Sequence, residues 1–142
     1  MSGATEILPG LWLGDTNSAH DNTFITDKQI QCIINCSDDP KFPNESTIEM
    51  KYYLQSKSSD MVRVLDDCSV LIKNNIKKYN ILVYYQTCDK YGVIIILMYL
   101  MKYGEISLSN SIELIKTKRP DINEVINNNL LLLKNYQKLI SI

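Results

Sequence analysis

The chain has 142 residues, of which 45% are hydrophobic and 22% are charged, and its formal net charge is −1. This length fits one domain with a single sizeable core, and this composition is ordinary for a soluble globular protein. The sequence holds two arginines, Arg63 and Arg119. So few arginines and a net charge near zero exclude an arginine-rich face for nucleic acid or an anionic membrane.

Short apolar or β-branched runs bounded by polar residues predict four strands, at residues 11–13, 31–35, 50–54 and 81–85. Before the last strand, apolar residues recur every three or four positions and predict a helix, namely Val62, Leu65, Cys68, Ile72 and Ile76. The apolar run from Val93 to Lys102 predicts a second helix directly after that strand. This alternation of strands and helices predicts an α/β layer fold with a mostly parallel sheet.

A further helical stripe, Leu108, Ile112 and Ile115, follows Ser107, a favourable N-cap, and ends before Pro120. It predicts a helix whose two ends are both signalled by the sequence.

The final segment, residues 127–142, also has apolar residues at helical spacing. Its four consecutive leucines, Leu130 to Leu133, wrap more than one face of the helix. We expect this helix to lie in the protein's own core, and the alternative is that part of it meets a partner or a second copy.

The four cysteines, Cys32, Cys36, Cys68 and Cys88, would allow two disulfides or part of a metal site. The chain has one histidine, His20, so a four-ligand zinc site would need nearly every candidate ligand to converge. We therefore expect reduced thiols, with Cys32 and Cys68 facing the core, and neither a metal nor a cofactor.

The N-terminal residues lack the basic and apolar regions of a signal peptide. The apolar run from Val93 to Met101 has about half the length of a membrane span. We expect an intracellular protein of the cytoplasm or nucleus, with no membrane or nucleic-acid partner.

The stretch from Ile81 to Gly92 combines an apolar strand, a short loop and the start of an apolar helix. It resembles the active-site loop of the dual-specificity phosphatases, which reads histidine, cysteine, five residues and arginine. On that pattern Tyr84 takes the histidine position, Tyr85 that of the nucleophilic cysteine and Tyr91 that of the phosphate-gripping arginine. Cys88 falls where the family usually has a loop glycine.

Other segments resemble the same family in the same order along the chain, namely residues 7–14, 29–35, 53–60, 98–101 and 116–120. The resemblance implies a three-layer α/β domain spanning residues 1–142, with a central, mostly parallel sheet of about five strands between helices. Asp60 takes the position of the general-acid aspartate. Its alternative role is an N-cap carboxylate for the helix that contains Leu65.

The family's mechanism needs an ionised thiolate, an arginine on the phosphoryl oxygens and an aspartate that protonates the leaving group. Tyr85 offers a phenol whose unperturbed pKa is about 10, and Tyr91 carries no charge. No cysteine of the chain is followed by an arginine six positions later. The resemblance thus implies a pseudophosphatase rather than an enzyme, similar to the human phosphatase-like protein named for its serine, threonine and tyrosine interactions.

Such a protein is expected to bind protein partners, among them phosphoproteins or members of a kinase or phosphatase pathway. The expected contact surface is the rim of the former active site, namely Tyr84, Tyr85, Cys88, Asp89, Lys90 and Tyr91. The alternative for Tyr84 and Tyr85 is that they pack the end of the strand.

Two other functions stay open, a phosphate-dependent reader of phosphoproteins and a residual dual-specificity phosphatase that uses Asp60. The small size and the abundance of Asn, Ile, Lys and Tyr also resemble phosphatase-like proteins of baculoviruses and poxviruses.

Overall fold

A five-stranded sheet forms the centre of the computed structural model, which describes residues 3–43, 46–54, 59–86 and 91–141. The strands are β1 (Thr5–Leu8), β2 (Leu11–Asp15), β3 (Ile30–Asn35), β4 (Met50–Tyr53) and β5 (Asn80–Tyr85). They lie in the order β1-β2-β5-β3-β4, with β1 antiparallel to β2 and every other neighbouring pair parallel. The expected sheet, mostly parallel and flanked by helices, is confirmed.

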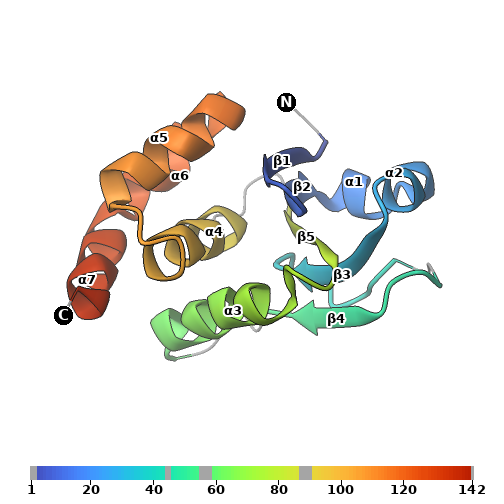
Figure 1. Cartoon of the computed structure of the whole chain (residues 1–142), viewed down its shortest axis with the longest axis horizontal. Coiled ribbons are helices and arrows are strands. Elements are labelled where there is room, and N and C mark those ends of the chain that lie inside the picture. The colour runs from blue at the N-terminus through green and yellow to red at the C-terminus, as the bar shows by residue number, and fades with distance from the viewer. Residues whose placement is uncertain (1–2, 44–45, 55–58, 87–90, 142) are drawn as a thin grey trace.

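Helices cover both faces of this sheet (Figure 1). The short helices α1 (Thr16–Ala19) and α2 (Asn22–Asp27) lie on one side. The other side holds α3 (Met61–Asn75), α4 (Tyr91–Lys102), α5 (Leu108–Lys118), η1 (Pro120–Ile122), α6 (Asn123–Asn128) and α7 (Leu130–Ile140). Within the described ranges, no helix is long and apolar enough to cross a membrane.

The central strand β5 feeds two cores, because successive side chains of a strand point to opposite faces. Ile81, Val83 and Tyr85 join the large core beneath α3 to α7. Leu82 and Tyr84 join the smaller core beneath α1 and α2. The two consecutive tyrosines at the end of β5 therefore enter different environments.

The strand predicted at residues 11–13 belongs to a hairpin, whose first arm the sequence did not predict. Gly10 adopts a positive φ of 83°, which is a left-handed conformation that glycine takes without strain. The chain reverses there, so β1 and β2 pair with Thr5 opposite Leu13. The strand predicted from residue 11 is the second arm of this hairpin.

The helices predicted from apolar spacing are largely confirmed. In α3 the side chains of Leu65, Cys68 and Ile72 are buried, but Val62 is 38% exposed and lies outside the core. Ser107 caps α5, since its hydroxyl accepts a hydrogen bond from the Asn110 amide at 3.1 Å.

The last helical segment differs from the prediction in two ways. It is broken at Asn129, which ends α6 with φ −125° and ψ 14°, before α7 begins. In α7, Leu133 and Tyr136 are buried, whereas Leu131 is 75% exposed and Leu139 is 67% exposed. The expectation that this helix lies in the core is therefore wrong for these two leucines, which are exposed beside Val62 of α3.

Candidate functional site

The carboxyl ends of β2, β3 and β5 meet at one edge of the sheet, where α/β folds commonly hold their active sites. Strand β5 ends at Tyr85, and α4 begins at Tyr91. This is the strand, loop and helix arrangement that the sequence predicts. Cys88, Asp89 and Lys90, three members of the expected contact surface, lie outside the described residues.

Tyr85 points into the protein and is 8% exposed. Its phenolic oxygen accepts a hydrogen bond from Nη2 of Arg119 at 2.9 Å. Its ring packs against the first turn of α4, where a Cβ added to Gly92 would lie 3.3 Å from Tyr85 Cδ1. Burial raises the pKa of the Tyr85 phenol above its usual value, and the positive charge of Arg119 only partly offsets this effect.

Arg119 is the largest of the fully buried side chains, with 1% of its surface exposed. Besides Tyr85, its guanidinium donates hydrogen bonds to the backbone oxygens of Gly3 and Leu13 at 3.3 and 3.4 Å and to Asp121 at 3.2 and 3.3 Å. Burial alone would lower the pKa of Arg119, but the bonds to Asp121 and Tyr85 hold it above its usual value. With a further bond from Nη1 to Thr5 Oγ1 at 3.5 Å, one side chain ties β1, β2, β5 and η1 together.

Sequence reasoning noted Arg119 as one of two arginines, in a segment at residues 116–120 that resembles the family, and missed this role. Two signals could have pointed to it. Arginine is rare in this chain, and a residue before proline is held in extended backbone, as the φ of −136° and ψ of 85° of Arg119 show.

Tyr84 lies on the opposite face of β5 and is 1% exposed. Its hydroxyl donates to the backbone oxygen of Lys41 at 3.3 Å. The same loop is held by Asn35, whose amide nitrogen donates to the backbone oxygens of Asp39 at 2.8 Å and Lys41 at 3.2 Å. Burial raises the pKa of the Tyr84 phenol. The segment after β3 is therefore fastened down over Tyr84.

These positions correct the expectation that Tyr84 and Tyr85 present side-chain area to a partner. Both side chains are buried because β5 is the central strand and both faces of the sheet carry helices. The alternative role, in which they pack the end of the strand, describes them. Tyr91, the first residue of α4, is partly buried.

Asp15, a carboxylate that sequence reasoning did not single out, ends β2 beside Tyr85 and is 5% exposed. Burial alone would raise the pKa of its carboxyl. However, hydrogen bonds from the Gly3 and Ser18 amides, both at 2.9 Å, hold the pKa below its usual value. Asp15 is thus an ionised N-cap of α1 rather than a proton donor.

Comparison with protein families finds one matching model, "Dual specificity phosphatase, catalytic domain", over residues 11–138. The chain belongs to the dual-specificity phosphatase family. Comparison with curated proteins finds no sequence match.

Solved structures of dual-specificity phosphatases share the fold. Human DUSP28 superposes with a TM-score of 0.81 at 16% identity, covering 100% of each chain. A mouse putative dual-specificity phosphatase complexed with zinc tungstate gives 0.80 at 16% identity, covering 98% of this chain and 89% of that one. Human tyrosine phosphatase-like serine/threonine/tyrosine-interacting protein gives 0.78 at 18% identity, covering 98% of both chains. Identities this low show a common fold and nothing finer.

Asp60, which takes the general-acid position in the family resemblance, is the N-cap of α3. Its carboxylate accepts a hydrogen bond from the Arg63 amide at 3.2 Å, and the residue is exposed. The expected N-cap role is confirmed, and the general-acid role stays a prediction. Asp60 also lines a hollow of about 400 Å³ together with Lys102 of α4 and Leu139 of α7.

Three cysteines of this dual-specificity phosphatase domain, Cys32, Cys36 and Cys68, are free thiols and buried. The prediction that Cys32 and Cys68 face the core is confirmed. Burial raises the pKa of each of these two thiols to about 12, so neither supplies a thiolate at neutral pH. Among the described residues, no three His, Cys, Asp or Glu side chains gather closely enough to hold a metal ion.

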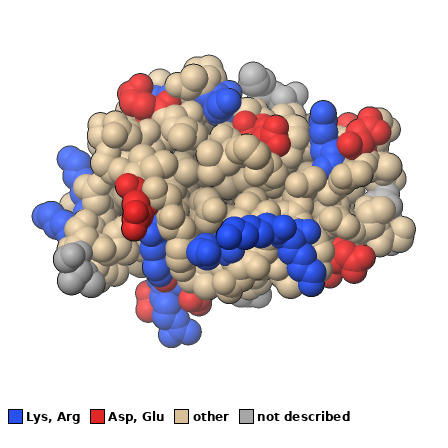
Figure 2. Space-filling view, in the orientation of Figure 1, with Lys and Arg blue, Asp and Glu red and all other residues tan. Residues whose placement is uncertain are grey.

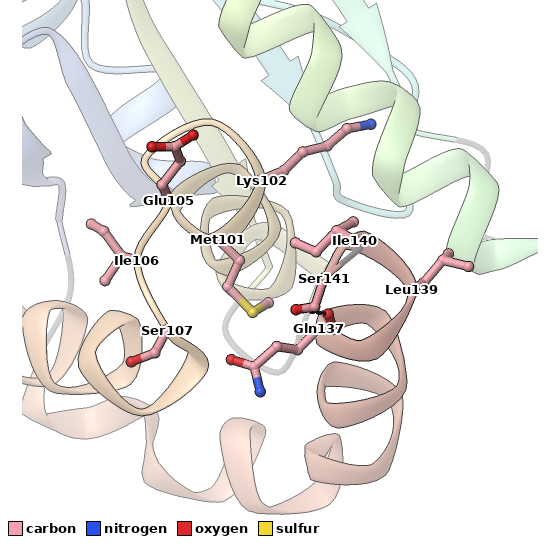
Figure 3. A pocket seen from close by; sticks show the side chains of 9 residues that line it. All are labelled: Met101, Lys102, Glu105, Ile106, Ser107, Gln137, Leu139, Ile140 and Ser141. Atoms are coloured by element: carbon pink, nitrogen blue, oxygen red, sulfur yellow. Dashed lines mark hydrogen bonds between the residues drawn. The ribbon is translucent and has the colours of Figure 1, made fainter.

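A hollow of about 680 Å³ lies at the opposite end of α4 from Tyr91 (Figure 3). It is lined by residues of the turn after α4 and by the end of α7. Two polar groups there are already bonded, since Gln137 Oε1 accepts from the Leu108 amide at 2.7 Å and Ser141 Oγ donates to the Gln137 backbone oxygen at 2.7 Å. This hollow shares no residue with the family's active-site positions.

Proposed function

We propose that this member of the dual-specificity phosphatase family is catalytically inactive and acts as a protein-interaction module. In this role it competes with active phosphatases for partners in phospho-signalling. The observation that carries the proposal is the buried hydrogen bond from Arg119 to the Tyr85 phenol, 2.9 Å long.

Tyr85 supports inactivity through its chemistry. A phenol with a pKa of 10 is ionised to about one part in a thousand at pH 7, and burial moves the pKa of Tyr85 further up. Its oxygen is also engaged by Arg119 inside the protein. A residue at the nucleophile position therefore lacks both the charge and the access that attack on a phosphate requires.

Arg119 does not supply the cation that Tyr91 lacks. Its guanidinium is 1% exposed, and its donors are taken up by Tyr85, Asp121 and backbone oxygens. Gripping a phosphate would require breaking this buried network. Phosphate-independent binding to a protein partner is therefore favoured over phosphate-dependent reading.

An interaction role is also in keeping with one structural relative, which is named as a phosphatase-like interacting protein. By analogy, the partners of this chain would be phosphoproteins or members of a kinase or phosphatase pathway. The charge of the surface sets no strong preference for nucleic acid or membrane, because acidic and basic side chains are interspersed over the face seen in Figure 2.

Turnover of an aryl phosphate by the purified protein tests inactivity. We expect no hydrolysis above buffer over hours at high protein concentration, for the wild type and for Asp60→Asn alike. Turnover by the wild type that Asp60→Asn abolishes would overturn the proposal. The positive control is the triple variant Tyr85→Cys/Cys88→Gly/Tyr91→Arg. Any activity that it regains shows that the assay detects catalysis by this fold.

Thermal stability in tungstate, and in phosphotyrosine and plain tyrosine peptides, separates the two kinds of binding. A ligand that binds only the folded state raises its stability with occupancy. We expect no phosphate-specific shift up to millimolar concentrations. A shift with phosphotyrosine but not with tyrosine would instead identify a phosphate reader.

A further inference from the structure

Three large hydrophobic side chains of the described residues are exposed, and all three line one groove. Val62 of α3 is 38% exposed, and Leu131 and Leu139 of α7 are 75% and 67% exposed. With Leu132, Asn135 and Tyr136 they surround a hollow of about 490 Å³ between the two helices. Single exposed leucines are common on protein surfaces, but a cluster around one groove marks a site of interaction. We call these six residues the α3–α7 groove.

The groove has the shape that a helix fills. Leu131, Asn135 and Leu139 are four residues apart, so they form one stripe along α7. At 1.5 Å per residue the stripe is about 12 Å long, a little over two turns of helix. Leu139 also borders the neighbouring hollow that contains Asp60 and Lys102, and Figure 3 shows it on the side of α7 nearest α3.

Charge around the groove favours one kind of partner. Lys134 and Lys138 share the exposed side of α7 with Leu131 and Leu139, and Arg63 is exposed on α3. Asp66 of α3, which lines the neighbouring hollow with Asp60, is already engaged. It pairs with Lys102 at 3.2 Å and accepts from the Tyr136 hydroxyl at 2.5 Å. Two exposed carboxylates of α3, Asp60 and Asp67, stand against three exposed basic side chains, Arg63, Lys134 and Lys138.

A second copy of the chain fits this face poorly. Two-fold symmetry places the same patch on both subunits, and α7 contains two lysines and no Asp or Glu. Packing α7 against its copy would bring lysines toward lysines, and such like-charge contacts oppose association.

We propose that the α3–α7 groove is the docking site for an amphipathic helix of a partner protein, with apolar residues at positions i, i+3 or i+4 and i+7 and acidic residues beside them. This proposal rests on the proposed function and names the surface through which the inactive domain would act. Leu131 and Leu139 contact the apolar residues of the partner helix, and Lys134 and Lys138 pair with its acidic residues.

Selection from a displayed library of randomised amphipathic helical peptides tests the site, with Leu131→Glu/Leu139→Glu as the counter-selected protein. Both leucines face solvent, so this variant is expected to fold, which its thermal unfolding checks. We expect the selected peptides to be net acidic with apolar residues at the stated spacing. They should bind the double variant more than about tenfold more weakly, because central apolar anchors carry most of an interface's affinity.

Reversing the lysines gives the matched test of charge. The variant Lys134→Glu/Lys138→Glu keeps both leucines, and we expect about tenfold weaker binding of the same peptides, with a reduced dependence on salt. Neutral or basic selected peptides would overturn the acidic partner. A failure to enrich peptides over the leucine variant would overturn the site, and sedimentation showing a dimer that Leu131→Glu/Leu139→Glu dissociates would assign the groove to a second copy.

The two proposals fail separately. Hydrolysis of an aryl phosphate by the wild type would overturn inactivity while leaving peptide binding at the groove untouched. Absence of peptide binding without any hydrolysis would overturn the groove alone.

Discussion

Tyr85 and Leu131 are both large side chains, yet Tyr85 is buried at the end of the central strand and Leu131 is exposed on the last helix. At the carboxyl end of β5, Tyr85 is 8% exposed and bonded to Arg119. In the α3–α7 groove, Leu131 is 75% exposed. The apolar area that this chain offers to a partner therefore lies on its helical side, between α3 and α7.

The largest effect is expected from removing the buried hydrogen bonds that Arg119 makes around Tyr85. Arg119→Met should lower the free energy of unfolding by about 4 kcal/mol, because it leaves several buried hydrogen-bond acceptors without a donor. Urea unfolding gives this value from the midpoint and slope. Arg63→Met is the matched control, and at an exposed position it should change the stability by less than about 0.5 kcal/mol. A loss of stability for Arg119→Met as small as that of the control would mean that the buried network does not stabilise the fold.

A second comparison lies within α7, between two leucines that are two residues apart. Leu133 is fully buried, so Leu133→Ala should cost about 3 kcal/mol of stability. Leu131→Ala removes the same atoms from a side chain that is 75% exposed, and it should cost less than about 0.5 kcal/mol. Chemical denaturation of the two variants side by side measures the difference. Similar losses would show that Leu131 is packed, which would remove the anchor from the groove.

A smaller effect is expected at the other buried tyrosine. Tyr84→Phe keeps the ring in the smaller core and removes the hydroxyl that donates to Lys41 at 3.3 Å. The free energy of unfolding should fall by about 1 kcal/mol, which is the net contribution of one hydrogen bond. Hydrogen exchange of residues 36–43 should rise in parallel, since this bond fastens their segment to β5. Unchanged stability and unchanged exchange would show that the segment is held without Tyr84.

The smallest effect concerns alkaline pH. Burial raises the pKa of Tyr84 in the folded protein above its unfolded value of about 10. The unfolded chain therefore loses the proton first, and the stability present below pH 10 is lost as the pH rises further. The free energy of unfolding should fall more steeply above pH 10 for the wild type than for Tyr84→Phe. Parallel curves would mean that the Tyr84 phenol ionises as readily folded as unfolded.

Much of the fold follows from local patterns. Leu65, Cys68 and Ile72 are spaced for one face of a helix, and Ser107 with Pro120 marks the limits of the next predicted helix. Such signals depend on neighbours a few residues apart. The exposure of Val62, the first residue of the same helical pattern, could not be predicted. Periodicity identifies the apolar face of a helix but not where the core beneath it ends.

The site was harder to predict because its contacts join residues that are far apart in the sequence. The bond between Arg119 and Tyr85 joins residues 34 positions apart, and no spacing rule connects them. The two tyrosines of β5 were expected at a rim because their positions resemble those of exposed catalytic residues. Their burial depends on how much room larger side chains find inside, such as the space that Gly92 leaves beside Tyr85.

Arg119 has a further consequence for the edge of the sheet. It reaches Gly3, 116 residues away, and so holds the start of the chain in place as β1 pairs with β2. Contacts this distant in sequence close a long loop and are expected to form late in folding. Until they form, or whenever they break, β1 is held less firmly, and any β1 that detaches exposes the backbone groups of β2 to strand pairing with another chain. Loss of this one arginine would therefore be expected to appear as aggregation during folding, before any loss of secondary structure in the finished protein.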